Sequence, residues 1–404
     1  MPVRHDGRVA PALRSRTHGQ VPLLVLCAWG ALLLNVLPFL DLPVLVPIPG
    51  TVGRLVTQGT LLLAFVLALA ANPAGILRRS VFLGLLSVLA LFTLMASFHN
   101  EFPVGSVYRS LRLIGFISVL WLLTPWWGRS DMLLLRCHLR CVWFILVTVL
   151  AGALVDPGDA FALNGRLGGA LWPIPATQVG HYAAVATGSA VVLWLCRVIP
   201  GRWALAGIVV GGPLLALTHT RTAVLAMFVG VVIAGASLFF GHVRVRRTSA
   251  LGAALIVLVV SVFTRELTSW AVRGQEADDI GQLTGRTKVW SAVFAAPRTE
   301  IERIFGSGLS DQSFGGLPID SDWVSAYVDQ GWFGVAIHGA LVLVLLMMAT
   351  LHERGPQRAM ALFLVVYELV ASVTETTLVS PSPYLLELAL AASLLARLPS
   401  RRLG

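Results

Sequence analysis

A long polar stretch, residues 265–331, interrupts an otherwise apolar chain, and it carries side chains suited to chemistry. Its basic residues include Arg286 and Lys288, the only lysine of the chain, and its acids include Asp320 and Asp322 on either side of a serine. Guanidinium and ammonium groups bind phosphate, whereas an aspartate can accept a proton from a hydroxyl group. The stretch therefore predicts a site that binds an anion and moves a proton.

Further arginines lie at the ends of apolar runs. Arg221 stands in a tight polar turn, where it either reaches the lipid headgroups or grips a phosphate in a cavity. Arg109 and Arg112 are three residues apart and share one helix face, which suits either an anionic substrate or pairing with Glu101. Arg166 lies in a glycine-rich loop. We expect Arg109, Arg112 and Arg166 to be substrate-binding candidates.

A histidine and several glutamates occupy the apolar part of the chain. His181 is either a satisfied core histidine or a substrate contact. Glu368 and Glu387 fall within apolar runs, so each needs a partner or stays protonated. Glu375 lies in a turn between two such runs, where it can meet solvent and substrate. We therefore include His181 and Glu375 among the candidate substrate-binding residues.

The elements that must position these side chains are membrane-spanning helices. The chain has 404 residues, of which 56% are hydrophobic and 12% are charged, whereas soluble domains carry about 25% charged residues. A span needs about 20 apolar residues, which predicts an all-α polytopic protein with about 12 transmembrane helices. The expected segments are 21–40, 55–72, 80–98, 109–125, 138–155, 176–196, 203–218, 222–240, 249–264, 332–351, 357–373 and 383–397.

The distribution of arginine predicts how these helices are oriented. Cytoplasmic connections are enriched in arginine and lysine, and one assignment gathers most of the 30 basic residues on the side that also holds both termini. Residues 265–331 then face outward. The expected parts are a cytoplasmic tail (1–20), a first bundle of about nine spans (21–264), the extracytoplasmic loop (265–331), a second bundle of about three spans (332–397) and a cytoplasmic tail (398–404).

Several function classes are excluded or disfavoured. The net charge of +10 comes from short arginine clusters between apolar runs, so we expect no nucleic-acid partner. A phosphate-binding GxxxxGK[ST] loop is absent, which excludes an ATP-driven pump on this chain. Cys137 and Cys141 are one helical turn apart but lack the further ligands of a closed zinc site. Cys27 and Cys196 also read as buried apolar residues.

The long loop contains signals for local structure. Residues 283–296 predict an amphipathic helix, in which Val289 and Val293 share the apolar face with Trp290 beside them. Residues 306–308 predict a flexible Gly-Ser-Gly turn. Asp320 or Ser321 is expected to cap the helix that leads into the next span.

Three sequence blocks resemble the O-antigen ligase and O-antigen polymerase superfamily of bacteria. The first is Thr-Arg-Thr-Ala at 220–223, and the second is Gly-Arg-Thr-Lys-Val-Trp at 285–290, followed by Gly-Ser-Gly at 306–308. The third ends in Gly-Trp-Phe-Gly at 331–334. Arg166 and Gly169 resemble a weaker block. In ligases of this superfamily a histidine stands at the position of Asp320, so the departure leaves ligase and polymerase equally open.

The resemblance implies a C-type glycosyltransferase-like protein of the bacterial plasma membrane. Its donor would be a glycan linked to a polyprenyl diphosphate, and its acceptor a glycan or glycolipid. Arg221 and Arg286 would bind the diphosphate, and Asp320 or Asp322 would act as general base. Lys288 and Trp290 belong to the substrate-binding candidates. We expect no metal and no cofactor for this transfer, and the alternative function is a lipid or glycolipid transporter or flippase.

Overall fold

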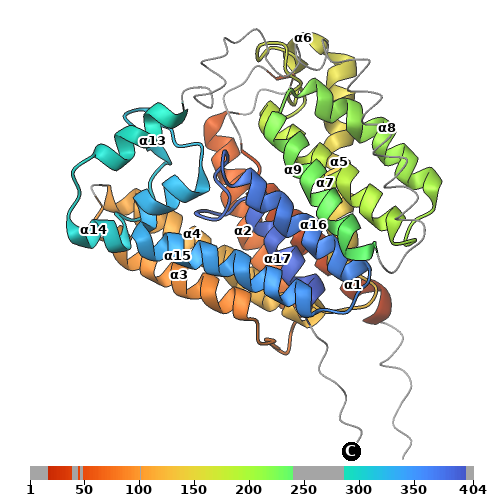
Figure 1. Ribbon diagram of the computed structural model, residues 1–404, viewed down its shortest axis with the longest axis horizontal. Helices are drawn as coiled ribbons and strands as arrows, with labels where there is room; N and C mark the ends of the chain where they lie inside the picture. The colour runs from red at the N-terminus through yellow and green to blue at the C-terminus, as the bar shows by residue number, and fades with distance from the viewer. Residues whose placement is uncertain (1–16, 39–43, 46–48, 101, 240–285, 397–404) are drawn as a thin grey trace, which may run out of the picture.

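The computed structural model describes residues 17–38, 44–45, 49–100, 102–239 and 286–396. Over these residues the protein is mostly helical, and long helices pack together in a bundle (Figure 1). Strands β1 (Ser313–Phe314) and β2 (Leu317–Pro318) form a short antiparallel hairpin within the loop that precedes α15 (Asp322–Leu351). This architecture agrees with the expected all-α membrane protein.

The helices of the bundle follow the apolar runs of the sequence. Each expected segment overlaps one helix, except segment 249–264, which lies outside the described residues. Besides α15, these helices are α1 (Thr17–Asn35), α2 (Gly50–Ala71), α3 (Val81–Ser97), α4 (Pro103–Leu122), α5 (Leu133–Val155), α7 (Ala176–Leu195), α8 (Gly201–Leu217), α9 (Arg221–Leu238), α16 (Pro356–Ala371) and α17 (Pro383–Leu395). Two short helices, η2 (Thr124–Trp126) and α6 (Pro157–Ala160), lie in connections.

The starts of several helices have a local cause. The side chains of Ser80 and Ser382 accept hydrogen bonds from the backbone N–H groups of Leu83 and Leu385, which caps α3 and α17. Proline opens α4, α16 and α17, where its missing N–H group costs no helical hydrogen bond. The helix boundaries therefore follow from residues next to the apolar runs.

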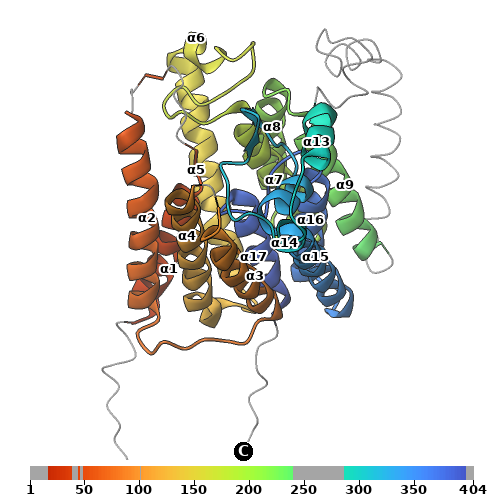
Figure 2. The same cartoon turned by 90° about the vertical axis from the view of Figure 1, so that its left-hand side faces the viewer.

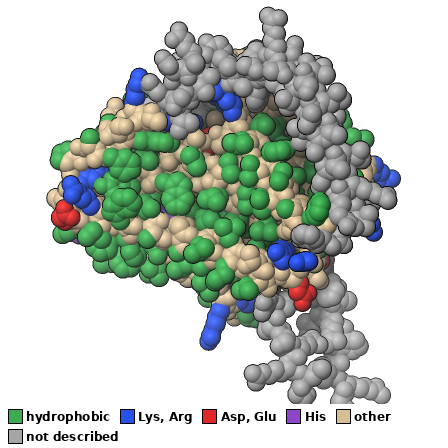
Figure 3. Space-filling model, in the orientation of Figure 1, with side chains coloured by type: hydrophobic (Ala, Val, Ile, Leu, Met, Phe, Trp, Pro, Cys, Tyr) green, Lys and Arg blue, Asp and Glu red, His purple; other side chains and the backbone are tan. Residues whose placement is uncertain are grey.

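Several helices have the length and composition of membrane-spanning helices. Within the described residues, four helices are long and apolar enough to cross a membrane: α2, α5, α9 and α15. Further apolar helices, such as α3, α8 and α17, are shorter. Figure 3 shows a face on which hydrophobic side chains are spread widely over the described surface and the few charged side chains lie toward its margins. Such a surface is suited to contact with lipid.

Backbone hydrogen bonds join the connections between helices in two groups, one at each end of the bundle. In the first group, Leu167 donates its N–H to the carbonyl of Leu217, and Asp322 donates its N–H to the carbonyl of Ser372. These contacts join connections that the arginine pattern predicts to be extracytoplasmic, and we call this end the site end. In the second group, Gly128 N–H donates to the carbonyl of Ser393. The site end is uppermost in Figure 2, where α6 lies at the top and α13 (Arg286–Ala295) in the upper half.

The described part of the long loop forms a small folded unit. Helix α13 overlaps the expected amphipathic helix, and residues 283–285 lie outside the described residues. A second short helix, α14 (Glu300–Phe305), begins with a capping box between Thr299 and Glu302. Val293 of α13 packs with residues at the start of α15 in a small core, which consists of Val293, Ile319, Val324, Tyr327 and Val328. The loop is thereby held to α15.

The Gly-Ser-Gly segment is a packed contact, so the prediction of a flexible turn was wrong. Gly306 has φ of 76° and Gly308 has φ of 84°, values that favour glycine. The N–H of Gly308 donates to the carbonyl of Asp329 at 2.9 Å. A Cβ atom on Gly306 would overlap the backbone of Asp329, and one on Gly331 would overlap the backbone of Ile304. Two glycine backbones therefore pack at the junction of α14 and α15.

The start of α15 also differs from the expectation. The helix begins at Asp322 and continues through a non-helical residue, Gly331, at which two helical parts meet. Ser321 occupies the N-cap position, but its side chain makes no capping hydrogen bond. Asp320 is instead paired with Arg286. Ser321, one of the two expected residues, is therefore the N-cap, but the capping hydrogen bond expected from its side chain is not formed.

Candidate functional site

An ion pair connects the two halves of the loop at the site end. The Nε atom of Arg286, the first residue of α13, lies 3.2 Å from Oδ2 of Asp320. The two side chains are 24% and 41% exposed, so both remain accessible to a ligand. The pair places a guanidinium group and a carboxylate side by side. A phosphate can therefore compete with Asp320 for Arg286.

Arg166 is held against the turn that precedes α9. Its Nε atom donates to the carbonyl of Thr218 at 2.9 Å, and one terminal nitrogen donates to Oγ1 of Thr220 at 3.3 Å. Arg221 follows this turn as the first residue of α9 and is partly buried. The turn therefore brings two arginines from distant parts of the sequence to one place.

A hydrogen bond joins this arginine-bearing turn to the turn after α16. Oγ1 of Thr222 lies 2.8 Å from Oγ1 of Thr374. Glu375 is the next residue, and it lies beyond the end of α16. The Thr222–Thr374 contact therefore sets Glu375 near the start of α9.

Glu375 interacts with the same charged groups. Burial raises the pKa of the Glu375 carboxyl to about 7, an effect that Arg286, His181 and Arg166 oppose and Asp320 strengthens. Arg166 and Arg286 also influence each other electrostatically. Arg166, Arg286, Asp320 and Glu375 therefore form one charge cluster, which comes from four separate segments of the chain.

The cluster has the chemistry of an anion site with a proton acceptor. Arginine stays charged and presents several N–H donors to a phosphate. Arg166 and Arg286 face Asp320 and Glu375, and Arg221 begins the adjacent helix. Below about pH 7, where Glu375 is mostly protonated, the two arginines of the cluster outweigh the single negative charge of Asp320. The arrangement can bind a phosphate group while Asp320 accepts a proton.

Asp322 has a different environment from Asp320. It is fully buried, and Oδ2 lies 2.9 Å from Nδ1 of His338. Its other oxygen accepts the N–H groups of Thr377 and Leu378 at 2.9 and 2.6 Å. Asp322 therefore fastens the turn that carries Glu375 to the start of α15, and it acts as a positioning residue.

Arg109 and Arg112 have partners outside the charge cluster. A terminal nitrogen of Arg112 donates to the backbone carbonyl of Asn35 at 2.5 Å, which ties α4 to the end of α1. Arg109 contributes positive charge beside Asp311 in the loop. The expected partner Glu101 lies outside the described residues. Arg112 therefore helps to join α4 to α1, and Arg109 interacts electrostatically with the loop.

Lys288 and Trp290 lie on different faces of α13. Lys288 is exposed, whereas Trp290 is partly buried and packs against the small core of the loop. Trp290 is four residues after Arg286 and shares its helix face. Trp290 therefore helps to hold α13 against the small core, whereas Lys288 is exposed.

Sequence reasoning did not identify a buried network around His181. Nε2 of His181 lies 3.0 Å from Oε1 of Glu387, and Nε2 of His138 lies 3.3 Å from the same oxygen. Nδ1 of His181 lies 3.1 Å from Oη of Tyr367. The interpretation of His181 as a core histidine fits these contacts. His138 was not singled out as a partner, although a histidine within an apolar run is a signal for such a contact.

Three members of this region could hold a metal ion. Within the described residues, His181, Glu368 and Glu387 each offer a ligand atom, and these atoms lie within 4.8 Å of one another. All three side chains are buried. This set shares no residue with the charge cluster, although His181 interacts electrostatically with Glu375.

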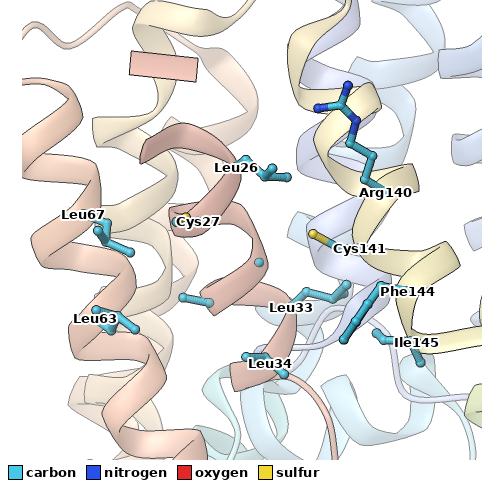
Figure 4. A pocket seen from close by; sticks show the side chains of 12 residues that line it. Leu26, Cys27, Leu33, Leu34, Leu63, Leu67, Arg140, Cys141, Phe144 and Ile145 are labelled. Carbon is cyan, nitrogen blue, oxygen red and sulfur yellow. The ribbon is translucent and has the colours of Figure 1, made fainter. Parts of the chain in front are cut away.

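A cavity of about 410 Å³ opens elsewhere, between α1, α2 and α5 (Figure 4). Leucines such as Leu33 and Leu67 line it together with Cys27, Cys141 and Arg140. Both cysteines are free thiols, but Cys27 is exposed and Cys141 is only partly buried. The prediction that Cys27 is a buried residue was therefore wrong. The cavity contains no residue of the charge cluster, so it is no part of the candidate site.

No protein-family model matches the chain, and no curated protein is similar to it in sequence.

Proposed function

We propose that this protein is a membrane glycosyltransferase that moves a saccharide from a polyprenyl-diphosphate carrier to a glycan or glycolipid acceptor. It would lie in a bacterial plasma membrane with about 12 spans and both termini in the cytoplasm. The site end would face outward. The proposal covers ligases and polymerases of the O-antigen superfamily, which the sequence blocks resemble.

The convergence of Arg166, Arg286, Asp320 and Glu375 carries the proposal. These residues are far apart in sequence, yet they interact at one end of the bundle, and Arg221 begins the helix beside them. A diphosphate needs concentrated positive charge. A glycosyl acceptor needs a base to accept its hydroxyl proton, and a carboxylate can serve as that base. The cluster supplies both.

The proposed reaction begins when the diphosphate of the donor binds the arginines. It competes with Asp320 for Arg286 and thereby frees the carboxylate of Asp320. An acceptor hydroxyl then attacks the anomeric carbon of the donor sugar. The new bond joins the acceptor oxygen to that carbon, while the bond from the carbon to the phosphate oxygen breaks. The hydroxyl proton goes to Asp320, and the bonding electrons leave with the diphosphate, whose charge the arginines stabilise.

The decisive experiment is transfer of a glycan from a lipid-linked donor in proteoliposomes. Arg221→Ala and Arg286→Ala are each expected to lower the rate by about 10²-fold to 10³-fold, the usual effect of removing one group that stabilises developing charge. Arg303→Ala is the control, because Arg303 is half exposed on α14 and pairs with Glu300. Wild-type rates in both the Arg221 and Arg286 variants would overturn the proposal.

Deletion of the gene in its native organism distinguishes the two activities that the proposal covers. A polymerase deletion leaves single glycan units attached to their acceptor and removes long chains. A ligase deletion leaves long chains on the lipid carrier and removes their attachment. The size distribution of the surface polysaccharide therefore separates the two.

The buried Glu368 and Glu387 favour a lipid or glycolipid transporter as a second candidate, because intramembrane acids often line ion paths. A transporter would move a labelled lipid across vesicles without forming a glycosidic bond. Such movement without transfer, in vesicles that contain donor and acceptor, favours this second candidate.

A further inference from the structure

Three polar side chains from three helices meet in the core of the bundle. They are His181 of α7, Glu368 of α16 and Glu387 of α17, which are exposed by 0%, 2% and 0%. Their ligand atoms lie within 4.8 Å of one another. Among the described residues, no N–H group and no serine, threonine or tyrosine hydroxyl donates to Glu368, whose carboxyl group interacts with that of Glu387. Two buried carboxylates side by side are costly, so this cluster requires either a shared proton or a cation between them.

We propose that His181, Glu368 and Glu387 bind one divalent transition-metal cation, of which Zn²⁺ fits best. One imidazole nitrogen and two carboxylate oxygens are common zinc ligands, at about 2.0–2.2 Å from the ion. Tetrahedral ligands at that distance lie roughly 3.3 Å apart. The 3.0 Å between Nε2 of His181 and Oε1 of Glu387 is close to this separation.

Charge balance supports a divalent ion. Two carboxylates beside each other repel strongly in a medium of low dielectric constant. A divalent cation neutralises both at once, and the site then carries no net charge inside the bundle. Metal sites in helical bundles are built in this way, from inward-facing acids and histidines on neighbouring helices.

The surrounding residues orient the proposed ligands. Nε1 of Trp29 can only donate, and it lies 3.3 Å from Nδ1 of His138, so His138 carries its proton on Nε2. That proton faces Oε1 of Glu387 at 3.3 Å. Oη of Tyr367 contacts Nδ1 of His181 and leaves Nε2 directed at the carboxylates. Such outer hydrogen bonds fix the orientation of ligands at metal sites.

The cation would join the three helices that support the charge cluster. Helix α16 leads directly into the turn with Glu375, and His181 interacts electrostatically with that residue. The ion would therefore fix α7, α16 and α17 relative to one another and so stabilise the turn that carries Glu375. It would not contact the substrate. Whether the ion binds can be measured without any assay of glycosyl transfer.

Metal content of the purified full-length protein tests the proposal. The protein is prepared without a polyhistidine tag, washed with a chelator and measured by elemental mass spectrometry. The wild type is expected to hold about one Zn²⁺ per chain, and Glu368→Gln less than about a tenth of that, because an amide is a poor zinc ligand. Glu353→Gln is the control, since Glu353 is exposed and follows the C-terminal end of α15, outside the proposed ligand set. It should keep the full content.

A wild type without stoichiometric metal, or a Glu368→Gln variant with unchanged metal, would overturn the proposal. The first result would indicate that the two carboxyl groups share a proton instead. A second measurement needs no variant: protein produced with Co²⁺ should show the intense visible absorption of a four-coordinate cobalt site, and its absence counts against the site. Neither readout depends on glycosyl transfer, so each proposal can fail alone.

Discussion

The Nε atom of Arg286 lies 3.2 Å from Oδ2 of Asp320, although the loop from α13 to α15 separates the two residues. This pair joins the anion-binding group and the proton acceptor of the proposed reaction. It also explains how the site avoids unpaired charge before substrate binds. A diphosphate can take over Arg286 and leave Asp320 free.

Replacing Asp320 tests its role as proton acceptor. Asp320→Asn keeps the size of the side chain and its contact with Arg286 but removes the basic oxygen. We expect kcat to fall about 10²-fold to 10⁴-fold, the usual contribution of a general base, with little change in KM. Asp320→His restores a base of the kind that ligases of the resembling superfamily carry, so part of the rate should return. Equal rates for wild type and Asp320→Asn in a transfer assay would exclude this role.

Replacing Arg286 by lysine tests phosphate binding by a forked donor. Lysine keeps the charge, but it cannot donate two parallel hydrogen bonds to a phosphate. We expect KM for the lipid-linked donor to rise about tenfold, a change of about 1.4 kcal/mol. The same change at Arg303 serves as the control, since that residue lies on the exposed side of α14. Equal KM values for Arg286→Lys and wild type would contradict bidentate binding.

The carboxyl of Glu375 should make stability depend on pH. Burial raises its pKa to about 7 from the ordinary value of 4.5. The folded protein therefore binds this proton more tightly than the unfolded chain does. The resulting stabilisation is complete below pH 4.5 and is lost as pH rises through about 7.

Glu375→Gln should remove this dependence. Thermal unfolding in detergent is expected to give a wild-type Tm that falls between about pH 5 and about pH 8 by more than the Tm of the variant does. Glu353→Gln, at an exposed glutamate, should follow the wild type. If the Tm of wild type and of Glu375→Gln changed with pH in the same way, burial would not raise the pKa of this carboxyl.

Asp322 should matter for stability first and for transfer second. Asp322→Ala leaves His338 and the N–H groups of Thr377 and Leu378 without their acceptor. Breaking a buried charged contact costs about 3–5 kcal/mol, so we expect a large fall in Tm. Asp322→Asn retains one acceptor oxygen and should lose less. A Tm for Asp322→Ala within error of the wild type would rule out the positioning role.

Gly331 should tolerate no side chain. Its φ of 66° is unfavourable for other residues, and a Cβ atom would overlap the backbone of Ile304. We expect Gly331→Ala to lower stability by about 1–3 kcal/mol or more. Gly339→Ala is the matched control in the same helix, because a Cβ atom there meets nothing within 4 Å. Alanine at Gly339 should be neutral or stabilising, and similar unfolding curves for both variants would argue against the packed glycine contact.

The helices and their approximate ends follow from local features of the sequence. Long apolar runs form helices because a helix satisfies its own backbone hydrogen bonds, and serine or proline at their starts sets the boundary. The alternation of arginine-rich connections also grouped the expected outer loops, which is why Arg166, Arg221 and Arg286 were candidates together. These signals are local, or they repeat along the chain.

Which of the two neighbouring acids is accessible depends on the packing of the folded chain. Asp320 is 41% exposed beside Arg286, whereas Asp322 is buried against His338. Nothing in the local sequence separates them, because their difference comes from the turn after α16, which packs on α15 from a distant part of the chain. The contact of His138 with Glu387 likewise depends on how α5 and α17 pack. Such contacts are set by the packing of whole helices, and no periodicity or short motif encodes them.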